Sequence, residues 1–250
     1  RRCEVEFLHY QETNEYASFV VASRYLFYVK IMRYIGIKVL KLIFLSTILV
    51  SCVSNERKLV PSTPQEALTV LLEGNKRYAE DVSIHPNCDI ERVKETASHQ
   101  KPFAAVVGCS DSRVPIELLF DQGIGDIFVI RTAGNNLSGK MVMGSIEYAV
   151  GHLGVKVLLV LGHGACGGVT SAVQGGEHHG NIGLLLQSIQ QDIPEYIGRV
   201  ELLDEAIMEH TYVQVDKILS NDLIKEKVAN GELLVKAAYY DVNTGIVEVK

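Results

Sequence analysis

The chain has 250 residues and is 47% hydrophobic, which is enough apolar material for a folded core, so disorder is excluded as its main state. Its 24 basic and 30 acidic residues give a net charge of −6. A protein that binds a phosphate backbone needs a basic face, so nucleic acid is not expected as a partner. Five cysteines are too few for a disulfide scaffold in a chain of this length, which points to metal binding or catalysis for some of them.

The first fifty residues differ from the rest of the chain. Residues 1–51 hold seven basic and four acidic side chains, so the remaining 199 residues carry 17 basic and 26 acidic ones, a net charge of −9. Met32 opens a basic stretch that leads into a mostly apolar run, 42–50, which at nine residues is less than half of the roughly 20 needed to span a bilayer. This pattern predicts a signal peptide over 32–51, and residues 1–31 are interpreted as an extension of the gene model upstream of the true start.

The end of the apolar run carries a candidate lipidation site. Leu49-Val50-Ser51-Cys52 resembles the lipobox of bacterial lipoproteins, in which the cysteine is acylated and becomes the new N-terminus. The resemblance implies a lipid anchor on Cys52 and a location in the bacterial cell envelope, on its periplasmic or surface side. The alternative is a signal anchor or a buried apolar helix with an incidental cysteine; without a signal the protein is expected in the cytoplasm. Residues 52–62 have the polar, proline-containing composition of a tether, which leaves 63–250 as the folded domain.

The first part of this domain alternates between helical and strand patterns. Thr63-Pro64-Gln65-Glu66 has the form of a capping box and predicts an amphipathic helix that extends to Tyr78. A second helix is expected from about Lys140 to Leu153. Short continuous apolar runs, typical of strands covered on both faces, lie at 102–107, 126–130 and 155–161.

The remaining part is mainly helical and ends in a hairpin. Helical patterns cover about 168–173, 181–193 and 202–229, and two strand patterns at 233–241 and 245–249 flank a tight turn. The alternation of buried strands with helices predicts an α/β fold with a mostly parallel central sheet flanked by helices.

Two cysteines and a histidine directly follow two of the predicted strands. Cys109 lies in GCSDSR after the first strand, and His163 and Cys166 lie in GHGACGG after the third. The carboxyl ends of parallel strands share one edge of a sheet, so these side chains are expected to converge although 54 residues separate Cys109 from His163. Two thiolates and an imidazole suit Zn²⁺ and leave its fourth tetrahedral position open, which is typical of a catalytic site.

Asp111 and Arg113 lie two and four residues after Cys109. The carboxylate could be the fourth zinc ligand, or it could pair with the guanidinium of Arg113 and orient a bound water. A bidentate pair would keep Asp111 ionised and turned away from the metal, with one oxygen free to accept a hydrogen bond from zinc-bound hydroxide. Zinc lowers the pKa of bound water toward roughly 7, so hydroxide would form near neutral pH.

With these residues the sequence resembles the β-class carbonic anhydrases, whose hallmark is CxDxR followed about fifty residues later by HxxC. The resemblance covers roughly residues 63–250. It includes three further segments: Leu71-Leu72-Glu73-Gly74-Asn75, Arg131-Thr132-Ala133-Gly134-Asn135 and Tyr239-Tyr240-Asp241-Val242-Asn243-Thr244-Gly245.

The resemblance implies a zinc enzyme that catalyses the reversible hydration of CO2 to bicarbonate and a proton through zinc-bound hydroxide. Cys109, His163 and Cys166 would hold the zinc. Asp111 and Arg113 would form the orienting pair, and in a closed form Asp111 would bind the metal instead. The family also implies a homodimer or a dimer of dimers, with each site near a subunit interface.

One position departs from the pattern of the plant-type members. Their pocket contains a glutamine that hydrogen-bonds the substrate, and that position corresponds to Gly123 here, with Gln122 beside it. Gln122 is therefore the candidate for this role. The chain has no tryptophan, so allosteric control through a bicarbonate site built on tryptophan is not expected.

Two other functions stay open at the level of sequence. Hydrolysis of CS2 or COS on the same zinc scaffold would differ in access to the pocket and not in the ligands. A zinc-stabilised binding protein without catalysis would keep Asp111 locked on the metal. Cys3 and Cys88 have no ligand-type neighbours and are interpreted as incidental.

Overall fold

A computed structural model describes residues 61–250 of the chain. The predicted extension 1–31, the predicted signal peptide 32–51 and the lipidation site at Cys52 lie outside the described residues. Within the part that is described, no helix is long and apolar enough to cross a membrane.

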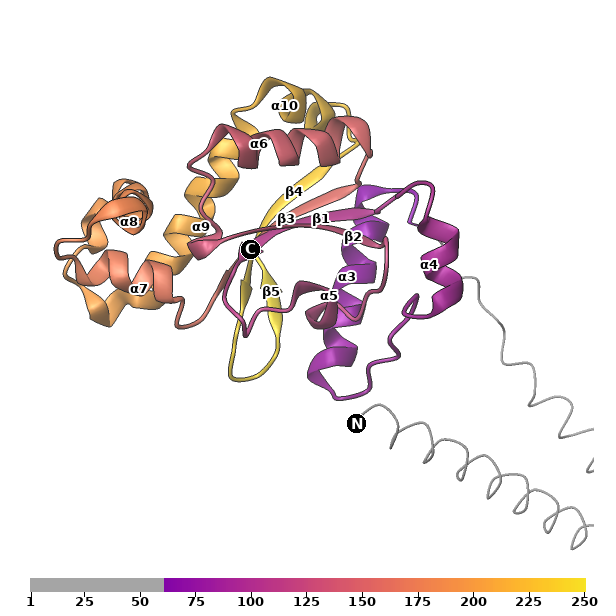
Figure 1. The fold of residues 1–250 in the computed structure, drawn as a ribbon, viewed down its shortest axis with the longest axis horizontal. Coiled ribbons are helices and arrows are strands. Elements are labelled where there is room, and N and C mark those ends of the chain that lie inside the picture. The colour runs from indigo at the N-terminus through magenta and orange to yellow at the C-terminus, as the bar shows by residue number, and fades with distance from the viewer. Residues whose placement is uncertain (1–60) are drawn as a thin grey trace, which may run out of the picture. The chain divides into compact units, whose positions relative to one another are not determined.

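The described residues form a five-stranded sheet with helices on both faces (Figure 1). The strand order is β2-β1-β3-β4-β5, in which the first four strands run parallel and β5 pairs antiparallel with β4. The predicted α/β fold with a mostly parallel sheet is therefore confirmed. The strands are β1 (Ala104–Cys109), β2 (Ile127–Thr132), β3 (Val157–His163), β4 (Leu234–Tyr240) and β5 (Val247–Val249).

Helices connect the strands and cover the sheet. The α-helices are α3 (Pro64–Ala79), α4 (Ile90–Thr96), α5 (Ile116–Leu119), α6 (Lys140–Glu147), α7 (Gly167–Gln174), α8 (Gly180–Asp192), α9 (Leu203–Leu219) and α10 (Asp222–Ala229). The shorter turns are η1 (Ala133–Asn135), a π-helical turn η2 (Tyr148–His152) that continues α6, η3 (Pro194–Tyr196) and η4 (Val200–Leu202).

The predicted helix over 202–229 is wrong as a single element, because the structure divides it into α9 and α10. The break occurs at Asn221, whose side chain accepts a hydrogen bond from the backbone N–H of Ile224 and so begins a new helix. α4 has no counterpart among the predicted helices. None of its residues is buried, so its sequence lacks the apolar stripe by which an amphipathic helix is recognised.

The two faces of the sheet carry separate cores, since successive residues of a strand point to opposite sides. Ala104 and Val106 of β1 pack with α3 and α5, whereas Ala105 and Val107 pack with η2 and α10. Figure 1 shows α3 and α5 on one face and α6 and α10 on the other. A third apolar cluster, formed by α7, α8 and α9, surrounds Cys109 at the carboxyl end of the sheet.

The predicted capping box begins α3. The side chain of Thr63 accepts from the backbone N–H of Glu66 at 3.2 Å, and the Glu66 carboxylate accepts from the backbone N–H of Thr63 at 3.2 Å. Pro64 occupies the first helical position. One turn from its end, α3 approaches α5 so closely that a Cβ on Gly74 would lie 1.8 Å from the carbonyl oxygen of Phe120.

Gly74→Ala is therefore expected to destabilise the protein by about 3 kcal/mol, because backbone atoms of α5 would have to move to admit the methyl group. The matched control is Gly144→Ala in α6, where an added Cβ meets nothing within 4 Å. That substitution is expected to stabilise by about 0.5–1 kcal/mol through the better helix propensity of alanine. Chemical denaturation of the wild-type protein and the two variants measures both effects. Equal stabilities of the two variants would contradict the close α3–α5 contact.

Candidate metal centre

Three predicted ligands meet at the carboxyl edge of the sheet. Cys109 is the last residue of β1 and His163 the last residue of β3, and these strands are direct neighbours in the sheet. Cys166 immediately precedes α7, three residues after His163. One ligand atom from each side chain lies within 4.8 Å of the others, and all three residues are buried. The structure thus brings together the Cys, His and Cys side chains that the sequence placed after separate strands.

The geometry of this cluster fits a tetrahedral zinc ion. The two sulfurs lie 3.9 Å apart, and two Zn–S bonds of about 2.3 Å at a tetrahedral angle would place them about 3.8 Å apart. Nδ1 of His163 donates to the carbonyl oxygen of Gly164 at 3.0 Å, which leaves the lone pair on Nε2. Nε2 is buried without a hydrogen-bond partner among the described residues, as expected for an atom that binds a metal.

The surroundings of Cys109 favour its thiolate form. A hydrogen bond from the Cys166 thiol lowers the pKa of Cys109 to about 4, and the backbone N–H groups of Asp111 and Gly134 donate to the same sulfur, at 3.4 and 3.2 Å. Sharing that hydrogen bond, together with burial, raises the pKa of Cys166. Cys109 is therefore a thiolate, which is the form that binds zinc.

Asp111 and Arg113 form a bidentate pair beside the cluster. Oδ1 of Asp111 accepts from the Arg113 backbone N–H and from Nε, both at 2.9 Å, and Oδ2 accepts from Nη2 at 2.7 Å. Nη2 also donates to the carbonyl oxygen of Ala165 at 3.0 Å, so Arg113 joins the two loops that carry the ligands. Oδ2 of Asp111 lies 4.0 Å from Nε2 of His163. Of the two arrangements that the sequence left open, the structure has the Asp–Arg pair.

This pairing keeps Asp111 ionised. The hydrogen bond from the Arg113 side chain is the largest effect that holds the pKa of Asp111 well below its usual range, and it outweighs the opposing effect of partial burial. The Asp111 side chain is 17% exposed and that of Arg113 is 50% exposed. The pair is therefore closer to solvent than the three buried ligands are.

Two residues that support the site had no assigned role in the sequence. Nε of Arg131 donates to the carbonyl oxygen of Cys109 at 2.9 Å, and Nη2 donates to that of Asp111 at 2.7 Å. Gly134 provides the N–H bond to the Cys109 sulfur. Both lie near the carboxyl end of β2, the strand next to β1 and its ligand Cys109. This position in the sheet is the signal that could have identified them.

Gln122, the predicted substrate-pocket residue, is buried in the packing between α3 and α5. Its side-chain Nε2 donates to the carbonyl oxygen of Phe120 at 2.9 Å and lies 3.0 Å from the place that a Cβ on Gly74 would take. A contact of this amide with substrate stays a prediction.

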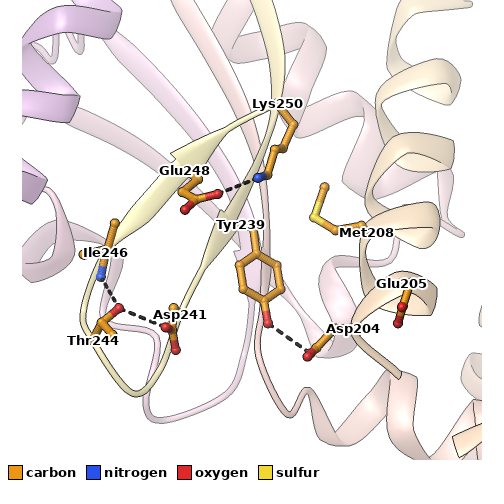
Figure 2. Close-up of a pocket in the computed structure, with 9 residues that line it drawn as sticks. All are labelled: Asp204, Glu205, Met208, Tyr239, Asp241, Thr244, Ile246, Glu248 and Lys250. Carbon is orange, nitrogen blue, oxygen red and sulfur yellow. Dashed lines mark hydrogen bonds and ion pairs between the residues drawn. The ribbon is translucent and has the colours of Figure 1, made fainter. Parts of the chain in front are cut away.

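A second hollow, of about 600 Å³, lies between α9 and the β4–β5 hairpin (Figure 2). The hydroxyl of Tyr239 donates to Asp204 at 3.0 Å, and Lys250 pairs with Glu248. None of the predicted site residues lines this hollow. Because several of its polar groups already pair with one another, the metal cluster is the stronger candidate for the functional site.

Comparison with known proteins agrees with this site. The family model described as carbonic anhydrase matches residues 104–247, a range that includes all three candidate ligands and the Asp–Arg pair. Carbonic anhydrase 2 of Mycobacterium tuberculosis is 36% identical over 197 residues, which cover 74% of this chain and 93% of that protein. The carbonic anhydrase of Mycolicibacterium smegmatis is also 36% identical, over 76% of this chain and 94% of that protein.

Solved structures give the same result. The β-carbonic anhydrase of Coccomyxa, determined in complex with acetazolamide, has 27% identity and a TM-score of 0.59, covering 73% of this chain and 85% of that one. A tetrameric β-carbonic anhydrase from Sordaria macrospora has 25% identity and a TM-score of 0.58, covering 73% of this chain and 95% of that one. Matched in sequence across most of its described residues, and in fold to enzymes of this class, the chain belongs to the β-class carbonic anhydrase family.

Proposed function

We propose that the protein catalyses the reversible hydration of CO2 to bicarbonate and a proton at a zinc ion held by Cys109, His163 and Cys166. The observation that carries this proposal is the placement of a bidentate Asp–Arg pair beside a buried cluster of three zinc-type ligands. The names of the similar carbonic anhydrases support the choice of substrate.

Zinc at this cluster would supply hydroxide near neutral pH by lowering the pKa of water from 15.7 toward about 7. The protein's own residues would then orient that nucleophile. Arg113 fixes the Asp111 carboxylate through three hydrogen bonds, and Oδ2 faces the cluster from 4.0 Å away from His163 Nε2. An ionised carboxylate only accepts hydrogen bonds, so Asp111 would accept one from the oxygen that attacks CO2 and so orient it.

Asp111 is not the group that carries the proton away. Because Arg113 holds its pKa well below the usual range, the carboxylate does not take up a proton near neutral pH. The proton released in each turnover must therefore pass to another acceptor. This assigns Asp111 and Arg113 to orientation rather than to proton storage.

Stopped-flow measurement of CO2 hydration by the zinc-loaded protein between about pH 6.5 and 9 tests the proposed function. Activity that rises with pH is expected, because deprotonation of the nucleophile limits the rate at low pH. A rate at the uncatalysed background throughout this range would refute it. Turnover of CS2 or COS in place of CO2 would show the alternative substrate.

The structure also bears on the non-catalytic alternative. A zinc-stabilised binding protein would have Asp111 on the metal, whereas here both carboxylate oxygens accept hydrogen bonds from Arg113. This arrangement favours an enzyme.

We further propose that the protein works as a homodimer or a dimer of dimers. The Sordaria macrospora relative is described as tetrameric. On the described part of this chain several large apolar side chains are exposed, among them Met141 at 86%, Leu184 at 66% and Ile182 at 58%. Sedimentation equilibrium is expected to give twice or four times the mass of one chain, and a monomer at micromolar concentration would contradict the proposal.

We also propose, from the sequence of the N-terminal region, that Cys52 carries a lipid anchor and places the domain in the cell envelope. Mass spectrometry of the protein from its native host is expected to show an acylated N-terminus at Cys52. Recovery of an unprocessed chain that still contains residues 1–51 would contradict both the signal peptide and the anchor.

A further inference from the structure

A chain of buried hydrogen bonds connects the Cys109 sulfur with α9. The backbone N–H of Gly134 donates to Sγ of Cys109 at 3.2 Å. The carbonyl oxygen of the same glycine accepts a hydrogen bond from Nε2 of His210 at 2.9 Å. A carbonyl can only accept, so Nε2 of this wholly buried histidine carries the proton.

The other side of the His210 ring faces a charged group. Nδ1 lies 3.2 Å from Oδ2 of Asp192 at the end of α8. Lys217 donates to both oxygens of that carboxylate, at 2.6 and 2.7 Å, and Gln214 donates to Oδ2 at 2.7 Å. Burial alone would raise the pKa of Asp192, but its contacts with His210, Lys217 and Gln214 outweigh it and lower the pKa. The ionised carboxylate of Asp192 thus holds the imidazole of His210 in place.

A second contact ties the same loop to α9. The backbone N–H of Leu137 donates to Oε1 of Gln214 at 3.1 Å, and Gln214 lies one helical turn after His210. Side chains on one face of α9 therefore hydrogen-bond residues 133–137 at two points.

The direction of the Gly134 N–H depends on the backbone conformation that these two contacts hold. Its φ is +66°, in the left-handed region, and the direction of its N–H follows from that backbone conformation. A hydrogen bond to a metal-binding thiolate withdraws charge from the sulfur and fixes its orientation, and loss of such outer contacts typically weakens metal affinity 10- to 100-fold.

We propose that His210 is a positioning residue for the metal centre: by holding the carbonyl of Gly134, it directs the Gly134 N–H onto Cys109 and so sets the strength of that sulfur as a donor. The inference rests on the proposed function in that it takes Cys109 as a zinc ligand. His210 touches neither substrate nor metal, and acts only through the loop.

The test compares His210→Leu with His210→Gln in the full protein loaded with Co²⁺ as a spectroscopic substitute for zinc. Leucine cannot donate to Gly134, whereas the amide of glutamine reaches about as far as Nε2. In His210→Leu, the sulfur-to-cobalt charge-transfer band is expected at longer wavelength, because the sulfur has lost a hydrogen bond. Zinc affinity, measured by competition with a chelator, is expected to fall about tenfold or more, because the sulfur is no longer fixed in the orientation that binds the metal. In His210→Gln both values are expected to stay close to those of the wild-type protein.

Two controls separate this effect from a general loss of stability. Tyr212→Phe changes an exposed side chain on the same helix, and Leu68→Val loosens the core on the α3 face of the sheet, in a cluster that includes none of residues 133–137. Neither is expected to move the charge-transfer band. If His210→Leu does not fold, His210→Asn takes its place, since its shorter amide falls short of the Gly134 carbonyl.

The outcomes are distinct. A His210→Leu protein with the wild-type spectrum and zinc affinity would overturn the role of His210. A His210→Gln protein that differs from the wild type as much as His210→Leu does would overturn it too. A wild-type protein that binds neither cobalt nor zinc would instead refute the proposed metal centre itself.

Discussion

Asp111→Asn is expected to reduce kcat/KM for CO2 hydration by about a hundredfold or more while the protein keeps stoichiometric zinc. Asparagine has nearly the same shape, but its amide has one acceptor oxygen, and its NH2 group cannot accept the hydrogen bonds that Arg113 donates to the carboxylate. Either the pair breaks, or the amide turns its NH2 toward the cluster. In both cases the acceptor that orients the attacking oxygen is lost, whereas the three ligand side chains are unchanged.

Stopped-flow kinetics and metal analysis on the same preparation check this prediction. Asp81→Asn is the matched control, because Asp81 is an exposed aspartate whose positive φ asparagine also tolerates. It is expected to leave both rate and zinc content unchanged. An Asp111→Asn protein with the wild-type rate would remove Asp111 from the mechanism, and one without zinc would make it a metal ligand.

Cys166→Ser is expected to have the other large effect, the loss of both zinc and activity. Loss of an outer-shell partner typically weakens metal affinity up to about 100-fold, so removal of one of the ligands themselves should exceed that. The serine hydroxyl is a poor substitute, because it is not ionised near neutral pH and is a harder donor than a thiolate. Hydration of CO2 is expected to fall to the background rate.

The chain offers a matched control in Cys88, an exposed free cysteine outside the cluster. Cys88→Ser is expected to retain one zinc per chain and full activity. Circular dichroism of both variants shows whether the fold persists. Full zinc content in Cys166→Ser would mean that the metal binds elsewhere.

The convergence of the ligands was predictable from the sequence because it follows from sheet topology. Short buried strands end at Cys109 and His163, and parallel strands place their carboxyl ends on one edge. The capping box at Thr63 was predictable for a similar reason, since its two hydrogen bonds join residues only three apart.

Other features depend on contacts between residues far apart in the chain. Which of its two possible roles Asp111 takes depends on the side-chain conformation of Arg113, and Arg113 is also held by the Ala165 carbonyl from a different loop. The contact of His210 with Gly134 joins residues 76 apart in the sequence and leaves no local pattern. The break between α9 and α10 interrupts the helical pattern by only three polar residues, 220–222, and the cap there is a single side chain, that of Asn221.

X-ray absorption at the zinc edge of the purified wild-type protein, combined with elemental analysis, tests the metal centre most directly. The arrangement of Cys109, His163 and Cys166 predicts one zinc per chain, two sulfur neighbours at about 2.3 Å and one imidazole nitrogen at about 2.0 Å. A protein that contains no stoichiometric zinc, or a zinc ion without two sulfur neighbours, would contradict it.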